Sequence, residues 1–367
     1  MIGISIVSMI ILLGVLIFAH EFGHFIMAKK SGVGVLKFSL GFGPKIFGKK
    51  IGETEYLLSA IPLGGYVKLL GESDVEGLSE EEQQRSFSKQ PILKRVMIVA
   101  AGPAFNFLLA IVIFTIVHMV GIPTLTSEIG TVQENSAAGE AGLKQGDVII
   151  AIDGERISRW NRLAETISAS EGRTLKISLN RNGVGQDLTI TPKLQKSKNI
   201  FGEEVDSYKL GISPASRTVI ERLNPLEAGW TSLKQTWMIS KLTVVSLVKM
   251  MEGVVSPKTL GGPILIAQMA GTQAREGIIP FILFMALLSI NLAVLNLLPV
   301  PVLDGGHLLF YFIEMVKGSE VSVKWREMAN QAGFVLLIIL MIFVFMMDID
   351  RLNIKAVNEF TKFFTGK

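Results

Sequence analysis

Two histidines and a glutamate, His20, Glu21 and His24, stand at the end of a long apolar run near the start of the chain. They form the pattern His-Glu-x-x-His, and residues four apart lie on one face of a helix, so both imidazoles can reach one metal ion. Glu21 lies about 100° further round the helix, where its carboxylate can reach a metal-bound water. Zinc lowers the pKa of such a water towards neutrality and the glutamate takes its proton, which is the chemistry of amide hydrolysis.

The surroundings of this pattern favour a functional role over a chance match. Residues 2–19 carry no charge and are close to the shortest run that can span a membrane. Titratable groups in such a helix are costly and call for a reason. A secretory signal peptide is the alternative, but the start has no basic region and no small-x-small cleavage site follows the run.

The composition narrows the protein class and the possible ligands. The chain has 367 residues, of which 49% are hydrophobic and 19% charged, which is too apolar for an ordinary soluble enzyme. The net charge is only +4, and no basic stripe with interleaved aromatics is present, so we expect no nucleic-acid partner. Cysteine is absent, so a metal site must use histidine, carboxylates or water.

Three further apolar runs, at 96–120, 278–298 and 334–347, bring the expected number of membrane helices to four. Lysine and arginine are concentrated between the first two runs and recur between the last two, which places both connections in the cytoplasm. Both termini and the insert 121–277 are then expected outside. Within the insert, residues 128–195 alternate polar and apolar in short runs typical of a small β-rich domain, and 158–169 has helical spacing.

Depth in the membrane limits the choice of a third metal ligand. His118 ends the second run, about 30 Å from the cytoplasmic side by helical rise, and is a poor candidate. Asp304 and His307 follow Pro299 and Pro301 at the inner end of the third run, near the depth of the first two histidines. Prolines break a helix, and irregular backbone at membrane depth must be buried or line a watery cavity. A helix cap at the membrane edge is the alternative role for Asp304.

The segments HEFGH (20–24), GPAFN (102–106) and NLLPVPVLDGG (296–306) together resemble the site-2 protease family of intramembrane zinc metalloproteases, most closely its bacterial members. The resemblance covers essentially the whole chain. It implies a single catalytic Zn2+ bound by His20, His24 and Asp304, with Glu21 as the catalytic base and His307 outside the metal shell. It also implies substrate contacts at Asn296, Pro299 and Pro301. Gly102 and Asn106 would pack against the catalytic helix, since small residues let membrane helices approach.

The resemblance implies an α-helical polytopic membrane protein with four transmembrane helices, a membrane-associated β-hairpin and an inserted α+β PDZ domain. We expect the first two helices within 1–120, the PDZ domain at 121–215, an amphipathic membrane-surface helix with its linker at 216–277, and the last two helices within 278–367. Family members can carry two PDZ domains, but this span holds one. The amphipathic pattern at 225–252 fits a helix on the membrane surface or one packed on the β-rich domain.

Two peptide-binding regions are expected from the same resemblance. Residues 51–71, with a Pro-Leu-Gly-Gly turn, resemble the family's membrane-dipping hairpin, in which Gly64 and Gly65 would lie at the substrate. An open strand edge there could pair with an extended substrate; an ordinary cytoplasmic hairpin is the alternative. In the PDZ domain, Leu210, Gly211 and Ile212 would border a groove that either binds C-termini or excludes bulky substrates by size.

The function implied is cleavage within the membrane segments of single-pass proteins, such as an anti-sigma factor or a signal-peptide remnant, after an upstream site-1 protease has cut the same substrate. The implied location is the bacterial inner membrane, in contact with lipid, with the active site towards the cytoplasm. A catalytically inactive PDZ-bearing scaffold is the main alternative, although every catalytic residue type is present. A metal-handling membrane protein would be expected to show His- or Met-rich tracts, which the sequence lacks.

Overall fold

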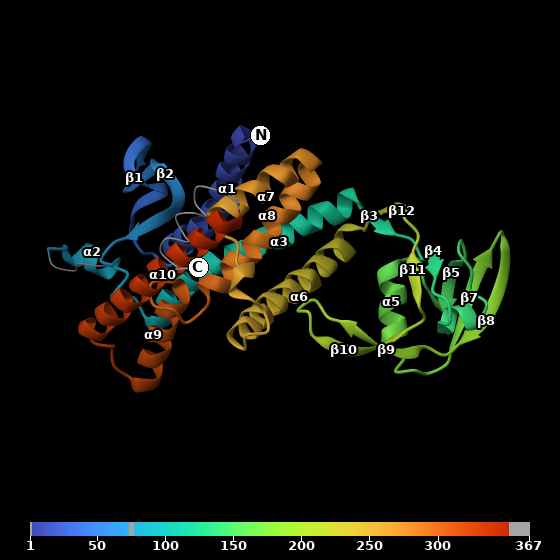
Figure 1. The fold of residues 1–367 in the computed structure, drawn as a ribbon. Coiled ribbons are helices and arrows are strands. Elements are labelled where there is room, and N and C mark those ends of the chain that lie inside the picture. The colour runs from blue at the N-terminus through green and yellow to red at the C-terminus, as the bar shows by residue number, and fades with distance from the viewer. Residues whose placement is uncertain (1, 73–76, 352–367) are drawn as a thin grey trace. The chain divides into compact units, whose positions relative to one another are not determined.

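The computed structural model describes residues 2–72 and 77–351, and the chain forms two compact units. The helical unit comprises Met1–Thr115, Gly229–Val248 and Ser256–Lys367, and the inserted unit comprises Ile116–Ala228 and Lys249–Val255. Figure 1 labels the elements of both units along the chain. Residues 352–367, the end of the expected last domain, lie outside the described residues. The expectation for the C-terminus concerns these residues.

Four helices among the described residues are long and apolar enough to cross a membrane, as predicted. They are α1 (Ile2–Lys30), α3 (Ile92–Val120), α8 (Ile278–Asn296) and α10 (Val323–Arg351). Three of them extend beyond the apolar runs because polar residues at their ends stay helical, whereas α8 ends two residues before the predicted run. In particular, α1 continues through the His-Glu-x-x-His segment to Lys30, so the two histidines lie on an unbroken helix.

The other helices between these segments, outside the inserted strands, are α2 (Glu80–Gln84), α6 (Pro225–Met251), the 3-10 turn η1 (Pro257–Thr259), α7 (Pro263–Glu276) and α9 (Asp304–Lys317). Asp304 is the first residue of α9, where a carboxylate interacts favourably with the positive end of the helix dipole. The buried carboxylate of Asp348 in α10 accepts hydrogen bonds from the backbone N–H groups of Gly262, Ile264 and Leu265 at the start of α7. It therefore satisfies donors that a helix start leaves without partners.

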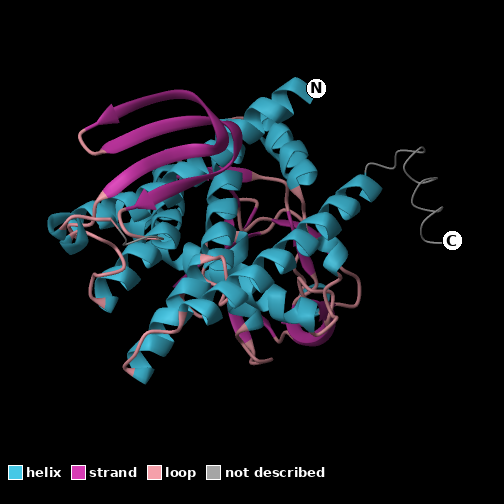
Figure 2. Cartoon of the chain, turned by 90° about the vertical axis from the view of Figure 1, so that its left-hand side faces the viewer, coloured by secondary structure: helices cyan, strands magenta, loops and turns pink. Residues whose placement is uncertain are grey.

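A curled antiparallel sheet lies beside α1 (Figure 2). It is built from β1 (Val35–Ile51) and β2 (Thr54–Leu69), and Phe38 of β1 pairs with both Val67 and Tyr56 of β2 because each strand folds back on itself. The sheet is therefore larger than the hairpin predicted at 51–71. Its tight turn falls at residues 52–53 instead of the Pro-Leu-Gly-Gly segment, which forms a bend within β2.

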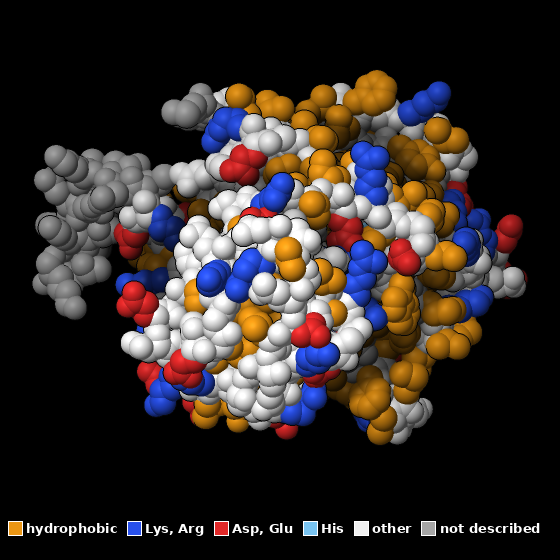
Figure 3. Space-filling view, turned by 90° about the vertical axis from the view of Figure 1, so that its right-hand side faces the viewer, with side chains coloured by type: hydrophobic (Ala, Val, Ile, Leu, Met, Phe, Trp, Pro, Cys, Tyr) orange, Lys and Arg blue, Asp and Glu red, His pale blue; other side chains and the backbone are white. Residues whose placement is uncertain are grey.

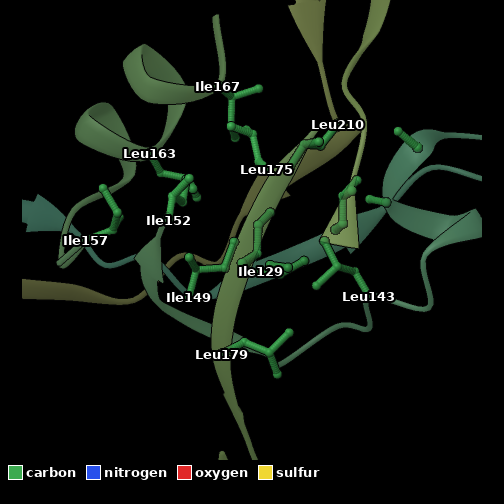
Figure 4. Close-up of a cluster of buried hydrophobic side chains, with 14 residues drawn as sticks. Ile129, Leu143, Ile149, Ile152, Ile157, Leu163, Ile167, Leu175, Leu179 and Leu210 are labelled. Atoms are coloured by element: carbon green, nitrogen blue, oxygen red, sulfur yellow. The ribbon is translucent and has the colours of Figure 1, made fainter. Parts of the chain in front are cut away.

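The inserted unit is an α+β domain, as predicted. Its strands are β3 (Ile122–Leu125), β4 (Ile129–Val132), β5 (Val148–Ile152), β6 (Glu155–Arg156), β7 (Leu175–Arg181), β8 (Val184–Ile190), β9 (Lys193–Lys198), β10 (Glu204–Lys209), β11 (Ile212–Pro214) and β12 (Thr218–Glu221), and its short helices are α4 (Ala137–Glu140) and α5 (Trp160–Ser168). One sheet has the order β6-β5-β7-β8, and β4 pairs with β11. Aliphatic side chains from these strands and from α5, including Ile149, Leu163 and Leu175, form its core (Figure 4).

One buried ion pair stands at the edge of this core. The Asp147 side chain is 1% exposed and accepts hydrogen bonds of 2.7 Å from both Nε and Nη2 of Arg181. Burial alone would raise the pKa of Asp147, but the bonds from Arg181 and from the Lys144 backbone outweigh it and hold that pKa below its usual value. The inserted unit therefore depends on this carboxyl being ionised.

The middle of α6, Gly229–Val248, groups with the helical unit, where Thr243 donates a 2.9 Å hydrogen bond to the side chain of Asn291 in α8. Other residues of α6 are exposed, including Trp230 and Trp237. Figure 3 shows that apolar side chains gather in places on the surface between charged ones. The position of α6 on a membrane surface stays a prediction.

Candidate metal centre

Two helices bring the three predicted metal ligands together. His20 and His24 lie one turn apart on α1, with 3.2 Å between their Nε2 atoms. Asp304, at the start of α9, places Oδ2 3.2 Å from His20 Nε2 and Oδ1 3.6 Å from His24 Nε2. One potential ligand atom from each residue lies within 4.8 Å of the other two. The three side chains are only 12%, 14% and 17% exposed, so the cluster is largely shielded from solvent.

The geometry of this cluster fits a zinc ion. Zinc–ligand distances of about 2.0–2.1 Å in a tetrahedral site set neighbouring ligand atoms about 3.3 Å apart. The three separations above lie close to that value. Asp304 Oδ2 is buried within ion-pair distance of His20, yet it accepts no hydrogen bond. A buried acceptor without a donor is costly, and a bound cation would satisfy it.

The Nδ1 atom of each histidine contacts the neighbouring helix α3, whereas α8 approaches His20 at Nε2. His24 Nδ1 lies 2.9 Å from the carbonyl oxygen of Ile98, which can only accept, so Nδ1 carries the proton and Nε2 keeps a lone pair for a metal. His20 Nδ1 lies 3.2 Å from the side-chain amide of Asn106. The amide nitrogen of Asn296, the last residue of α8, lies 3.5 Å from His20 Nε2. Such outer contacts orient metal-binding histidines.

Glycines allow α1 and α3 to touch at this centre. A methyl group on Gly23 would lie 2.7 Å from the carbonyl carbon of Ala101, so the two backbones approach directly. A methyl group on Gly102 would lie 2.5 Å from His24 Cε1 and 2.8 Å from His20 Cε1. Gly102 therefore keeps α3 close to the two imidazoles, because any side chain there would collide with the rings of His20 and His24.

The segment that delivers Asp304 is tightly constrained. Between α8 and α9, Val302 has a φ of 80°, an unusual conformation for a β-branched residue and one that surrounding structure must hold in place. A methyl group on Gly306 would lie 2.8 Å from both the carbonyl carbon of Val300 and the Cα of Pro301. A methyl group on Gly333 of α10 would in turn lie 2.9 Å from Pro301. The start of α9, the loop before it and α10 are therefore packed together without room for side chains.

A cavity of about 490 Å³ opens at the centre. Its walls include the three ligands, Glu21, Gly65 of the curled sheet and His307, together with polar residues farther along: Glu72, Arg95, Arg326 and Asn330. Glu21 is 9% exposed, and a methyl group on Gly65 would lie 2.9 Å from its Cγ, so the sheet contacts the His-Glu-x-x-His segment directly. Burial raises the pKa of Glu72 above its usual value.

An ionic network closes one side of this cavity. The Glu314 side chain, 1% exposed, lies 3.4 Å from Arg95 Nη2 and 3.1 Å from Arg326 Nη2, and so joins the starts of α3 and α10 to α9. The guanidinium of Arg95 also stacks 5.0 Å above the ring of Tyr311. Burial raises the pKa of Tyr311 to about 12, which keeps its phenol neutral. These contacts fix the helix that carries Asp304.

The other predicted site residues fall in several places. Gly64 has a φ of 146° and faces the ring of Phe42 instead of the cavity, and neither Pro299 nor Pro301 is among the cavity walls. His118 lies in the last turn of α3, outside the ligand cluster. The remaining three residues, Leu210, Gly211 and Ile212, line a separate pocket of about 290 Å³ in the inserted unit, beside α5.

Sequence reasoning missed the contacts that orient the ligands. The Ile98 carbonyl leaves no signal in a sequence because any residue supplies it. The constraint on Val302 was also missed, although the alternating prolines beside it mark an irregular segment. The arginines of the cavity were interpreted only as indicators of membrane orientation.

Comparison with known proteins gives consistent results along the chain. Residues 8–340 match the model of Peptidase family M50. A Campylobacter jejuni protein, whose name describes it provisionally as a zinc metalloprotease, is 36% identical and the match covers 95% of this chain and 94% of the relative. The regulator of sigma-E protease RseP of Salmonella typhimurium is 32% identical, with 95% and 99% covered. The PDZ domain of an SdrC-like protein from Listeria monocytogenes matches 24% of this chain and 84% of its own length, at 22% identity and a TM-score of 0.19.

Proposed function

Because the chain belongs to peptidase family M50, we propose that it is a zinc endopeptidase that cuts the membrane segments of single-pass proteins. Membership makes it a multi-pass membrane protease; the ligand set, the catalytic base and the substrate class are the proposal. The observation that carries it is the convergence of His20, His24 and Asp304 on one point, beside Glu21, on helices apolar enough to span a membrane.

The proposed chemistry uses few groups. His20 and His24 offer Nε2 lone pairs and Asp304 offers a carboxylate oxygen to hold the metal. When bound, zinc supplies Lewis acidity that polarises the scissile carbonyl and acidifies water. Glu21 accepts a proton from the attacking water as its oxygen bonds to the carbonyl carbon, and returns it to the leaving nitrogen as the C–N bond breaks. The products are a new carboxylate and a new amine.

The substrate must be unwound to reach this chemistry, because a helical peptide bond is shielded by its own hydrogen bonding and side chains. The curled sheet lies beside Glu21 at Gly65, so an extended segment that paired with this sheet would pass the metal centre. The Asn296 amide, close to His20, is suited to hold a substrate carbonyl or N–H. We therefore assign substrate alignment to the sheet and Asn296, with Pro299 and Pro301 shaping the loop that follows.

We further place the protein in a bacterial inner membrane, with the metal centre towards the cytoplasm and the inserted domain outside. The support is the concentration of lysine and arginine between α1 and α3, together with Lys317 at the end of α9 and Lys324 and Arg326 at the start of α10. In this orientation a substrate whose outer part has been removed by an earlier protease can enter, and its cytoplasmic part is released.

The inserted domain, with proposed bounds 121–215, is proposed to be a single PDZ domain that screens substrates. The pocket bordered by Leu210, Gly211 and Ile212 beside α5 supports a site for an extended peptide. Either capture of the new C-terminus or exclusion of a bulky outer domain would favour substrates that have already been shortened.

The test compares wild type with Glu21→Gln in lipid nanodiscs. The substrate is a tagged single-pass helix with helix-breaking residues at its centre, offered with a short or a folded outer part. Wild type should cleave the short form within the apolar segment, and Glu21→Gln should leave it intact while keeping one zinc per chain. Asp304→Asn should lose zinc. Equal cleavage by Glu21→Gln with zinc bound would refute the proposed base. Zinc binding without cleavage by wild type would instead favour the inactive-scaffold alternative.

A further inference from the structure

The His20 ring lies between two side-chain amides whose hydrogen-bonding requirements conflict. Asn106 Nδ2 lies 3.2 Å from His20 Nδ1, and Asn296 Nδ2 lies 3.5 Å from His20 Nε2. A neutral imidazole has one N–H group and one lone pair, so it cannot accept a hydrogen bond at both nitrogens. One of the two amides must therefore present its oxygen to the ring.

The surroundings of the ring decide which amide this is. Nε2 faces His24 Nε2 at 3.2 Å and Asp304 Oδ2 at 3.2 Å, so it is the nitrogen that a shared metal ion would use. Its lone pair must then point at the metal, which leaves the proton on Nδ1. The group opposite Nδ1 has to be an acceptor, and Asn106 is the residue opposite it.

The environment of Asn106 permits this arrangement. Its side chain is fully buried, and its Oδ1 has no hydrogen-bond partner while its nitrogen faces the imidazole. The oxygen and nitrogen of an amide are nearly identical in shape, so their assignment follows from the hydrogen bonds they can make. Turning the amide over brings Oδ1 to His20 Nδ1–H, and the amide nitrogen takes the position in which Oδ1 has no partner.

We infer that Asn106 is a positioning residue whose Oδ1 accepts the Nδ1 proton of His20 and so fixes the metal-binding tautomer of that ring. This inference rests on the proposed metal site. It gives the two histidines matching support from α3, because His24 Nδ1 donates to the Ile98 carbonyl in the same way. The support for His24 comes from backbone, whereas the support for His20 can be removed by a side-chain substitution.

The α3–α8 interface holds Asn106 in place independently of its amide. Ser289 of α8 donates a 2.8 Å hydrogen bond to the backbone carbonyl of Asn106. Ser289→Ala therefore perturbs the packing of the same residue while leaving the amide opposite His20. It serves as the matched control for a packing effect.

The experiment measures zinc affinity of the full chain in nanodiscs by competition with a chelator. The variants are Asn106→Leu, which keeps a similar volume without an acceptor, Asn106→Asp, which keeps the oxygen, and Ser289→Ala. We expect Asn106→Leu to bind zinc about 10- to 100-fold more weakly, as is usual for loss of an outer partner of a metal ligand. Asn106→Asp and Ser289→Ala should stay within about threefold of wild type.

Each outcome has a distinct meaning. Equal affinity of Asn106→Leu and wild type would overturn the inference and leave the metal site intact. If Asn106→Asp loses as much zinc affinity as Asn106→Leu, Asn106 has a packing role, and the inference is overturned. The zinc affinity of Asn106→Asp decides the question if Asn106→Leu does not fold. Absence of zinc binding by wild type would instead remove the proposed metal site itself.

Discussion

Gly102→Ala is the smallest change that should disable the metal centre. The added methyl group would lie 2.5 Å from His24 Cε1 and 2.8 Å from His20 Cε1, whereas ordinary contacts begin at 3.4 Å. The His24 ring must therefore retreat by about 0.9 Å, or α3 must move away by a similar amount. Metal and catalytic groups must be held within about 0.5 Å, and a misplacement of about 1 Å can cost 100-fold in rate. We expect kcat/KM to fall about 100-fold, together with weaker zinc binding.

Two glycines of α1 provide controls for this change on α3. A methyl group on Gly14 meets no atom within 4 Å, so Gly14→Ala should keep wild-type activity and zinc affinity. A methyl group on Gly23 would press on the Ala101 backbone, so Gly23→Ala should lower the thermal midpoint even without metal. The assays are cleavage of the model helix and zinc competition, each in nanodiscs. The close approach of α3 to the ligands would be refuted if Gly102→Ala kept both its cleavage rate and its zinc affinity within about threefold of wild type.

Three further predictions concern the framework. Because the folded-state pKa of Asp147 is depressed, its contribution is fully present above the ordinary value of about 3.9 and is lost as pH falls from that value through the lower folded-state pKa. Asp147→Asn should therefore cost about 1.5–3 kcal/mol at neutral pH, seen as faster hydrogen exchange in the inserted unit, and the difference from wild type should shrink as pH falls below about 3.9; a pH-independent difference would contradict this. Glu314→Gln should lower the thermal midpoint because it leaves two arginines without their shared counter-charge. Adding Arg95→Met to this variant should recover part of the lost thermal midpoint, and no recovery would argue against the ionic network. Asp348→Ala should cost about 0.5–2 kcal/mol by removing the cap of α7, and an unchanged thermal midpoint would contradict that role.

The sequence was sufficient for features that depend on local pattern. Uncharged runs identified the four long helices, and the spacing of His20 and His24 required one helical face. Depth along those helices left Asp304 and His307 as the possible partners, and the structure places the first with the histidines and the second on the cavity wall.

Features set by long-range packing could not be predicted in this way. The extent of the curled sheet was underestimated because glycine, proline and lysine interrupt the apolar pattern of β1. The pairing of β1 on both of its edges depends on the bend of β2 at Gly64. The role inferred for Asn106 depends on one amide facing one ring nitrogen across 86 positions of sequence. Sequence spacing carries no information about such a contact.

The most direct test of the account is the mass of the products formed in ¹⁸O-labelled water from the model single-pass helix. Hydrolysis at the His20–His24–Asp304 centre predicts a new C-terminus carrying one ¹⁸O atom, located inside the apolar segment, and no product from Glu21→Gln that retains one zinc per chain. A labelled product of equal yield from zinc-bound Glu21→Gln, or a cut only outside the apolar segment, would contradict it.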